Sequence, residues 1–290
     1  RNESLKHATG QWVLIMDADE RIPESVAQNL RALLIPTEQP LSYLTYIKNY
    51  MRENDESSIL GHYVARVFRK TSETRFFGAI HEQLYPNWGH VNIPEESFHL
   101  IHLGYGDVKK KENKIKNRNT PMIQKALEQA KGTNQSLYSF YAYYMGSSMT
   151  NAKDMMHWMR ESITSCPDPQ NTPHVQVAYL ELIKAYYYAR DYAGGIEAAK
   201  EGLNQIPALK RYPDFLESYG VLLTANKQFE EALTQFSEVI SLAQNESNED
   251  HVFFTMQANR IGSWGTFFNM MLAANAIPDR QRAEDYAKLT

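Results

Sequence analysis

The chain has 290 residues, of which 43% are hydrophobic and 22% are charged, and its formal net charge at pH 7 is -4. This length and composition predict a folded protein of about two domains with a substantial buried core. The slightly acidic balance argues against a nucleic-acid-binding protein that works by neutralising phosphates. No apolar run approaches the roughly 20 residues of a membrane-spanning helix, so no transmembrane segment is expected. The single cysteine, Cys166, excludes a disulfide within the chain and fits a cytoplasmic location.

The region from residue 1 to about 106 mixes short apolar runs with turn signals. Such runs, bounded by glycine, proline and polar residues, are typical of buried strands. A proline near the start of a polar-apolar pattern suits the beginning of a helix. Alternation of strand, helix and further strands predicts an α/β or mixed layered domain. The predicted strands are 12–16, 41–50 and 63–69, and the predicted helix runs from Pro23 to about Leu34.

An acidic segment, Asp-Ala-Asp-Glu at 17–20, follows the first predicted strand directly. If the extended geometry continues, Asp17 and Asp19 point to the same side of the chain, at a strand end where α/β proteins bind ligands. Carboxylate oxygens suit hard divalent cations that bridge to phosphates. An alternative is an acidic turn that caps the helix near Pro23, because carboxylates favour helix N-termini. The segment by itself leaves both interpretations open.

From about residue 107 onward the pattern predicts helices arranged as repeated hairpins. The clearest unit spans 213–244, and its Gly220, Ala232 and Phe236 are the small and aromatic positions at which two helices pack closely. Gly195 precedes Ala232 by 37 residues, near the ~34-residue period of tetratricopeptide (TPR) repeats. Aromatic and methionine side chains are expected to fill the interfaces between helices rather than to form a ligand surface. These are Tyr138, Tyr141, Tyr143, Tyr144, Tyr186, Tyr187, Tyr188, Met155, Met156 and Met159.

Taken together, several motifs resemble family 2 glycosyltransferases of the GT-A fold. The first covers residues 1–20, with Arg-Asn at the start, a glycine, an aromatic-led strand and the acidic Asp-X-Asp (DXD) segment. The resemblance covers most of residues 1–120, and TPR-type hairpins follow the catalytic domain in many family members. The further motifs are Arg66-Val67-Phe68-Arg69, Gly78-Ala79-Ile80-His81-Glu82, His102-Leu103-Gly104-Tyr105, and Lys114 with Arg118-Asn119.

The resemblance implies a metal-dependent, inverting transfer of a sugar from a nucleotide-sugar donor to a peptide, protein or glycan acceptor. Asp19 and His102 would bind Mg²⁺ or Mn²⁺ at the donor's diphosphate, and Glu82 would be the catalytic base. Asp17 would contact the ribose or the metal's shell. Arg66 and Arg69 are candidates for contact with the diphosphate, although strand alternation lets only one set of side chains face the site.

We therefore expect a partial GT-A-like α/β domain with a mixed sheet at 1–106, followed by an all-α TPR-like solenoid at 107–290. The solenoid would recruit the acceptor or form a homodimer. No nucleotide-binding half of the family pattern precedes Arg1, so we expect an N-terminally truncated domain with little transferase activity alone. Two alternatives remain, a TPR-type interaction scaffold with a vestigial transferase domain, and a metal-dependent phosphohydrolase that uses Asp17, Asp19 and His102.

Overall fold

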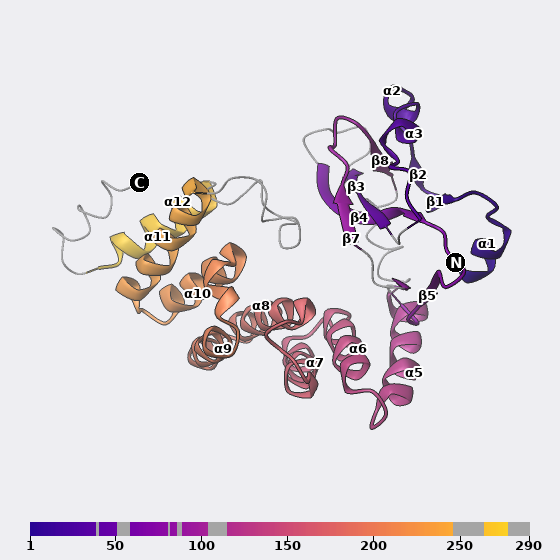
Figure 1. Ribbon diagram of the computed structural model, residues 1–290. Coiled ribbons are helices and arrows are strands. Elements are labelled where there is room, and N and C mark those ends of the chain that lie inside the picture. The colour runs from indigo at the N-terminus through magenta and orange to yellow at the C-terminus, as the bar shows by residue number, and fades with distance from the viewer. Residues whose placement is uncertain are drawn as a thin grey trace. The chain divides into compact units, whose positions relative to one another are not determined.

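The computed structural model describes two compact units of the chain, each with its own core. Contacts group the chain into one unit within Arg1–Ile115 and a second that begins at Lys116. The first unit contains a curled mixed sheet and the second is helical (Figure 1). The expected order of a sheet domain followed by a helical domain is thus observed, and the predicted boundary after 106 lies outside the described residues. The structure describes residues 1–38, 41–50, 59–80, 82–85, 89–103, 115–245 and 264–277.

The sheet of the first unit is built around β3 (Leu41–Tyr50). This strand pairs antiparallel with β4 (Ile59–Arg69) on one edge, and parallel with two shorter strands on the other. The strand order is β1-β4-β3-β8-β2, with β7 also beside β3, and β5 and β6 form a separate two-stranded sheet. The three predicted strands are present, although β1 ends at Leu14 instead of residue 16 and β4 begins earlier than expected. The remaining strands are β1 Trp12–Leu14, β2 Glu20–Arg21, β5 Arg75–Phe77, β6 Gln83–Tyr85, β7 Gly89–Asn92 and β8 His99–His102.

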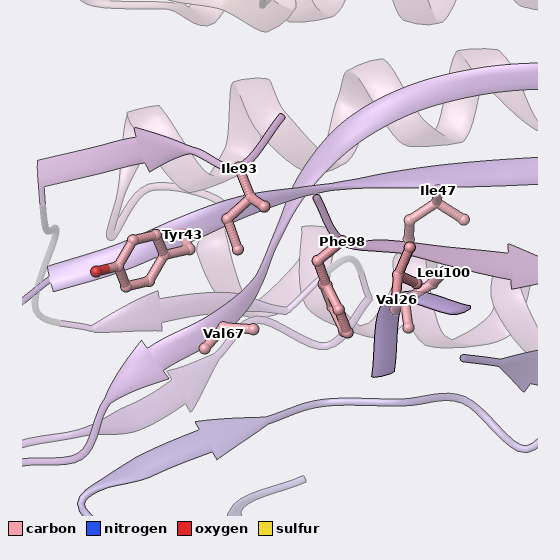
Figure 2. Close-up of a cluster of buried hydrophobic side chains, with 7 residues drawn as sticks. All are labelled: Val26, Tyr43, Ile47, Val67, Ile93, Phe98 and Leu100. Atoms are coloured by element: carbon pink, nitrogen blue, oxygen red, sulfur yellow. The ribbon is translucent and has the colours of Figure 1, made fainter. Parts of the chain in front are cut away.

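One face of the sheet is covered by two short helices, α2 (Glu24–Ala27) and α3 (Leu30–Leu33). Because strand side chains alternate, Tyr43 and Ile47 point to this face and pack with residues of the helices. The predicted single helix is wrong in its continuity, since the chain turns between α2 and α3, where Asn29 donates a hydrogen bond to the Ser97 carbonyl at 3.1 Å. The buried cluster comprises Val26, Tyr43, Ile47, Val67, Ile93, Phe98 and Leu100 (Figure 2).

A second, smaller cluster joins the N-terminal helix α1 (Asn2–His7) to β4 and β5. Leu5 packs with Phe68 and Phe76, whose ring centroids lie 5.8 Å apart. Asn2 exchanges two hydrogen bonds with the backbone of Phe76, at 2.8 and 2.7 Å. These contacts fix the Arg-Asn pair that begins the chain against β5.

The second unit consists of consecutive helices, each of which packs against the next along the chain. Its first element is a short π-helix, Ile115–Asn119. None of the helices that the structure describes is long and apolar enough to cross a membrane. The helices are α5 Thr120–Ala130, α6 Gln135–Ser147, α7 Ala152–Ser165, α8 Pro173–Tyr188, α9 Tyr192–Gln205, α10 Pro213–Ala225, α11 Phe229–Asn245 and α12 Trp264–Asn275, with a 3-10 turn at Pro207–Arg211.

The hairpin of α10 and α11 packs as the sequence predicts. A Cβ atom added to Gly220 would lie only 2.6 Å from Cε1 of Phe236, so the glycine lets the two helices approach closely. Ala232 and Phe236 are fully buried. The loops before α9 and α11 each contain a non-glycine residue with positive φ, Arg190 and Lys227, which lie 37 residues apart. A loop residue with positive φ therefore recurs at the 37-residue offset found between Gly195 and Ala232. The assignment of these helices to the TPR class stays a prediction.

The aromatic residues of the helical unit divide between core and surface. Tyr141 and Met159 are buried, as predicted. Tyr187 and Tyr188 are exposed at 40% and 72%, so the prediction that they fill a core is wrong. Both lie at the C-terminal end of α8, where the last residues of the helix are exposed. The helical pattern also predicts a further repeat unit from about His251, which begins outside the described residues.

Candidate functional site

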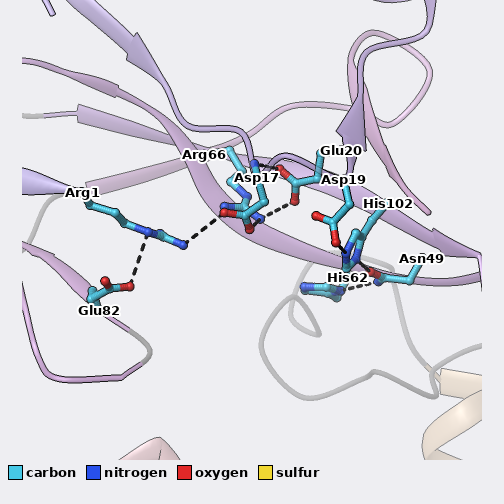
Figure 3. Close-up of polar contacts among 9 residues, drawn as sticks. All are labelled: Arg1, Asp17, Asp19, Glu20, Asn49, His62, Arg66, Glu82 and His102. Carbon is cyan, nitrogen blue, oxygen red and sulfur yellow. Dashed lines mark hydrogen bonds and ion pairs between the residues drawn. The ribbon is translucent and has the colours of Figure 1, made fainter. Parts of the chain in front are cut away.

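The segment after β1 is held beside β4 by antiparallel pairing that continues past the end of the strand. The amide of Ile15 donates to the Arg66 carbonyl at 2.8 Å. The register between β3 and β4 shifts at Arg66, which is the extra residue of a β-bulge. Bulges re-aim side chains, and the Arg66 guanidinium reaches two acidic residues of the 17–20 segment. Its Nη2 lies 3.0 Å from Asp17 Oδ2 and also contacts Glu20 Oε1 (Figure 3).

The acidic segment folds into a turn rather than continuing the strand. The Glu20 amide donates to the Asp17 carbonyl at 3.0 Å, and the Asp17 amide donates to Glu20 Oε2 at 2.7 Å. The expectation of an extended segment with Asp17 and Asp19 on one side is therefore wrong, because the two side chains leave the turn toward different partners. The helix-capping alternative has no support either, since α2 receives no side-chain capping hydrogen bond.

Asp19 and His102 are brought together by the pairing of β2 with β8. Glu20 stands opposite His102 in this pairing, and the Leu103 amide donates to the Asp19 carbonyl at 3.1 Å. Asp19 Oδ2 consequently lies 3.2 Å from His102 Nε2. The Asp19 side chain is about half exposed and the His102 ring is mostly covered, with exposed fractions of 54% and 21%. The pair is thus accessible from solvent on the carboxylate side.

This spacing suits a shared divalent cation. Two ligand atoms bonded to one ion at about 2.0–2.2 Å lie about 3 Å apart when the angle between the bonds is near a right angle. Among the described residues, no group of three or more His, Cys, Asp or Glu side chains could hold a metal. The pair would therefore supply only part of a coordination shell. That is how Mg²⁺ is often held, with one or two carboxylates and the rest of its shell from phosphates and water.

The ion pair with Arg66 affects the pKa of the Asp17 carboxyl group. Burial by itself would raise the pKa of Asp17, but the Arg66 guanidinium, with smaller contributions from Arg1 and His102, holds that pKa below its ordinary value. Arg66 is itself buried, and its Nε lacks a hydrogen-bond partner among the described atoms. Because two carboxylates already neutralise this guanidinium, the predicted contact of Arg66 with a diphosphate has no support in its surroundings.

Glu82 is linked to this cluster through Arg1. The Arg1 side chain lies 3.4 Å from Glu82 Oε2 and 3.6 Å from Asp17 Oδ1, so it bridges the two carboxylates (Figure 3). Gly78, with a φ of 102°, is in the left-handed region that favours glycine and turns the chain after β5. His81, Gly104, Tyr105 and Lys114 of the other motifs lie outside the described residues.

Arg69 is not part of this cluster. Its guanidinium donates to the Thr37 carbonyl at 2.7 Å and to the Gln11 carbonyl at 3.1 Å, and pairs with Glu38 at 2.9 Å. It therefore ties the loops at 11 and 37 to the end of β4. Because residues three positions apart leave a strand on different sides, Arg69 does not share the position of Arg66, and its predicted substrate contact stays a prediction.

Two residues beside the site escaped the sequence analysis, Asn49 and His62. Asn49 Oδ1 lies 2.8 Å from His102 Nδ1, and Asn49 Nδ2 lies 3.1 Å from His62 Nδ1. Burial lowers the pKa of His62, and the neighbouring Arg66 and His102 side chains lower it further. The available signal was the amide residue Asn49 on the alternating face of β3 that also carries Tyr43, Thr45 and Ile47.

No known protein-family model matches this chain, and no curated protein is similar enough to it to count as a relative. Any functional conclusion therefore depends on the motifs and on the geometry of the residues themselves.

Proposed function

We propose that this protein is a metal-dependent, inverting glycosyltransferase that acts on a nucleotide-sugar donor and a peptide, protein or glycan acceptor. The observation that carries the proposal is the 3.2 Å approach of Asp19 Oδ2 to His102 Nε2. These residues belong to different motifs of the family 2 resemblance and lie 83 positions apart in sequence. A chance resemblance gives no reason for them to meet.

In this proposal Asp19 and His102 hold Mg²⁺ or Mn²⁺, which when bound stabilises the negative charge that develops on the diphosphate leaving group. Arg66 keeps Asp17 ionised and oriented toward the ribose or the ion's water shell. Glu82 accepts the proton of the acceptor nucleophile as the bond to the anomeric carbon forms and the bond to the diphosphate oxygen breaks. Because Arg1 contacts Glu82, this ion pair has to open before an acceptor reaches the carboxylate.

The first test measures Mn²⁺ binding to the full chain. Binding is monitored as the loss of the free-ion signal in electron paramagnetic resonance. Asp19→Asn and His102→Gln should each weaken binding at least tenfold, because each removes one of two protein ligands. His99→Gln is the matched control, since His99 lies on the same strand but contacts the Glu95 carbonyl. Binding that is unchanged in both site variants would refute the metal site.

The transfer reaction, for which we expect only a low rate, is tested separately with a panel of nucleotide sugars. Release of nucleoside diphosphate should depend on Mn²⁺ or Mg²⁺ and on an added acceptor, and Glu82→Gln should abolish it while leaving Mn²⁺ binding intact. Release of inorganic phosphate without any acceptor would instead favour the phosphohydrolase.

A second candidate function is that of a protein-interaction scaffold, and a specific feature of the helical unit favours it. A hollow of about 450 Å³ is lined by α8 and α10. Its charged residues are three carboxylates, Glu181, Asp214 and Glu217, and one amine, Lys184. Burial raises the pKa of Asp214; Lys184 opposes this effect, and the carboxylates of Glu217 and Glu181 add to it. This net negative hollow suits a basic segment of an extended polypeptide.

The scaffold function is tested by fluorescence anisotropy with a lysine- and arginine-rich peptide and with its glutamate-rich counterpart. Preferential binding of the basic peptide, weakened in Glu217→Gln, would support it. Equal binding of both peptides would argue against it. A chain that binds the basic peptide but neither Mn²⁺ nor nucleotide sugars would be a scaffold rather than an enzyme.

A further inference from the structure

Asn49 is a buried polar residue of β3, the strand that lies between β4 and β8 beside the candidate site. It stands opposite His102 on β8 and opposite Leu60 on β4. Only 3% of its surface is exposed, so each of its amide atoms needs a hydrogen-bond partner within the protein. Figure 3 shows its amide in contact with both His62 and His102.

The direction of the Asn49 amide follows from a backbone group that can only accept. Its Nδ2 lies 2.8 Å from the Leu60 carbonyl oxygen, so the atom there has to be the amide nitrogen. The second hydrogen on Nδ2 points to His62 Nδ1 at 3.1 Å, which therefore accepts. The remaining atom, Oδ1, faces His102 Nδ1 at 2.8 Å. An amide oxygen accepts, and hence Nδ1 of His102 carries a hydrogen.

This assignment determines the state of the other ring nitrogen. A neutral imidazole with a hydrogen on Nδ1 has a lone pair on Nε2. That lone pair is directed at Asp19 Oδ2, which also offers only lone pairs when ionised. Two acceptors at 3.2 Å repel each other, so this arrangement favours a positive centre between them, either a proton or a metal ion.

We propose that Asn49 is the positioning residue of the site, which holds His102 in its Nδ1–H tautomer and presents Nε2 to a divalent cation shared with Asp19. The inference rests on the metal site of the proposed function. Outer hydrogen-bond partners of metal-binding histidines fix both the tautomer and the orientation of the ring, and their removal typically lowers metal affinity 10- to 100-fold.

The test combines Mn²⁺ affinity with the tautomer of His102, read from long-range proton–nitrogen NMR correlations of the metal-free protein above pH 8. In the unsubstituted chain His102 should carry its hydrogen on Nδ1. Asn49→Leu should shift the tautomer toward Nε2–H, which can donate to Asp19, and should weaken Mn²⁺ binding 10- to 100-fold. Thr45→Val is the matched control, because Thr45 is buried on the same face of β3 and its Oγ1 lacks a hydrogen-bond partner among the described atoms.

The outcomes separate the two proposals. If the unsubstituted chain does not bind Mn²⁺, the metal site fails and this inference fails with it. If the chain binds Mn²⁺ and a folded Asn49→Leu variant binds equally well, only the role of Asn49 is refuted. The tautomer in the unsubstituted chain needs no variant, so a hydrogen on Nε2 of His102 would overturn the inference even if every Asn49 variant failed to fold.

Discussion

The Arg66 guanidinium lies between two carboxylates of unequal exposure. The Glu20 side chain is only 1% exposed, whereas the Asp17 side chain is 49% exposed. A charge taken out of water needs a partner, and a buried carboxylate left alone is strongly unfavourable. Glu20 therefore depends on Arg66 far more than Asp17 does. By neutralising Glu20 and Asp17, Arg66 allows the acidic turn at 17–20 to pack against the sheet. The position of this turn determines where Asp19 lies.

We predict that Arg66→Met lowers the free energy of unfolding by about 3–5 kcal/mol, because it leaves the Glu20 carboxylate buried without its partner. The double variant Glu20→Gln, Arg66→Met should recover part of this loss, since the uncompensated charge is gone. Arg75→Met is the control, because Arg75 is exposed and lies over the Tyr85 ring. Urea denaturation of the four proteins measures all these values. A loss for Arg66→Met no larger than for Arg75→Met would contradict the argument.

At the scale of elements, the sequence predicts what depends on local pattern. Strand β3 was expected at 41–50 and is observed there, because a ten-residue segment rich in Tyr, Thr, Leu and Ile favours a strand. The close packing of Gly220 with Phe236 was likewise expected from the spacing of small and aromatic residues along two helices. In each case the signal lies within one segment or one hairpin.

What the sequence does not predict depends on strand register and on turns. The bulge that aims Arg66 follows from pairing with a strand about 20 residues away, and the turn that separates Asp17 from Asp19 is followed by pairing with a strand about 80 residues away. Asn49 and His62 join the site only because β3 lies between β4 and β8, and no local pattern contains that order. The pairing of Asp19 with His102 was expected from the family resemblance alone, since composition and periodicity gave no reason for it.

The contact between α10 and α11 leads to a second prediction. Gly220→Val should destabilise the protein by about 1–3 kcal/mol, because the added carbon atoms would overlap the Phe236 ring. Phe236→Leu in the same chain should recover part of the loss, and a double-mutant cycle by urea denaturation gives the interaction energy. Strictly additive effects of the two substitutions would show that the ring and the glycine do not compete for space.

The junction of α6, α7 and α8 leads to a third prediction, on pH. Ser139 donates its hydroxyl hydrogen to the Ser162 carbonyl at 2.7 Å, so Nε2 of His174 donates to Ser139 Oγ at 2.8 Å. Burial lowers the pKa of His174 from 6.5 to about 4. Between these values only the unfolded chain takes up the proton, so stability is full above pH 6.5 and declines as the pH falls toward 4.

Each pKa unit corresponds to about 1.4 kcal/mol, so the decline attributable to His174 is about 3.5 kcal/mol at most. The measurement is the difference in unfolding free energy between the unsubstituted chain and His174→Gln, from pH 7.5 to 4.5. This difference should shrink steadily as the pH falls. His157→Gln is the control, because His157 is exposed on α7. A difference independent of pH would mean that His174 is readily protonated in the folded protein.

At the scale of the whole molecule, the two compact units have separate cores, one formed by the sheet with α2 and α3 and the other by the stacked helices. Units with separate cores generally unfold as separate cooperative transitions. We predict two transitions in calorimetry, with Arg66→Met lowering the midpoint of one and Gly220→Val lowering the midpoint of the other. If both substitutions shifted one shared transition, the units would be energetically coupled. The candidate metal site could then not be treated as a property of the sheet alone, and a substitution in the helices would be expected to change Mn²⁺ affinity.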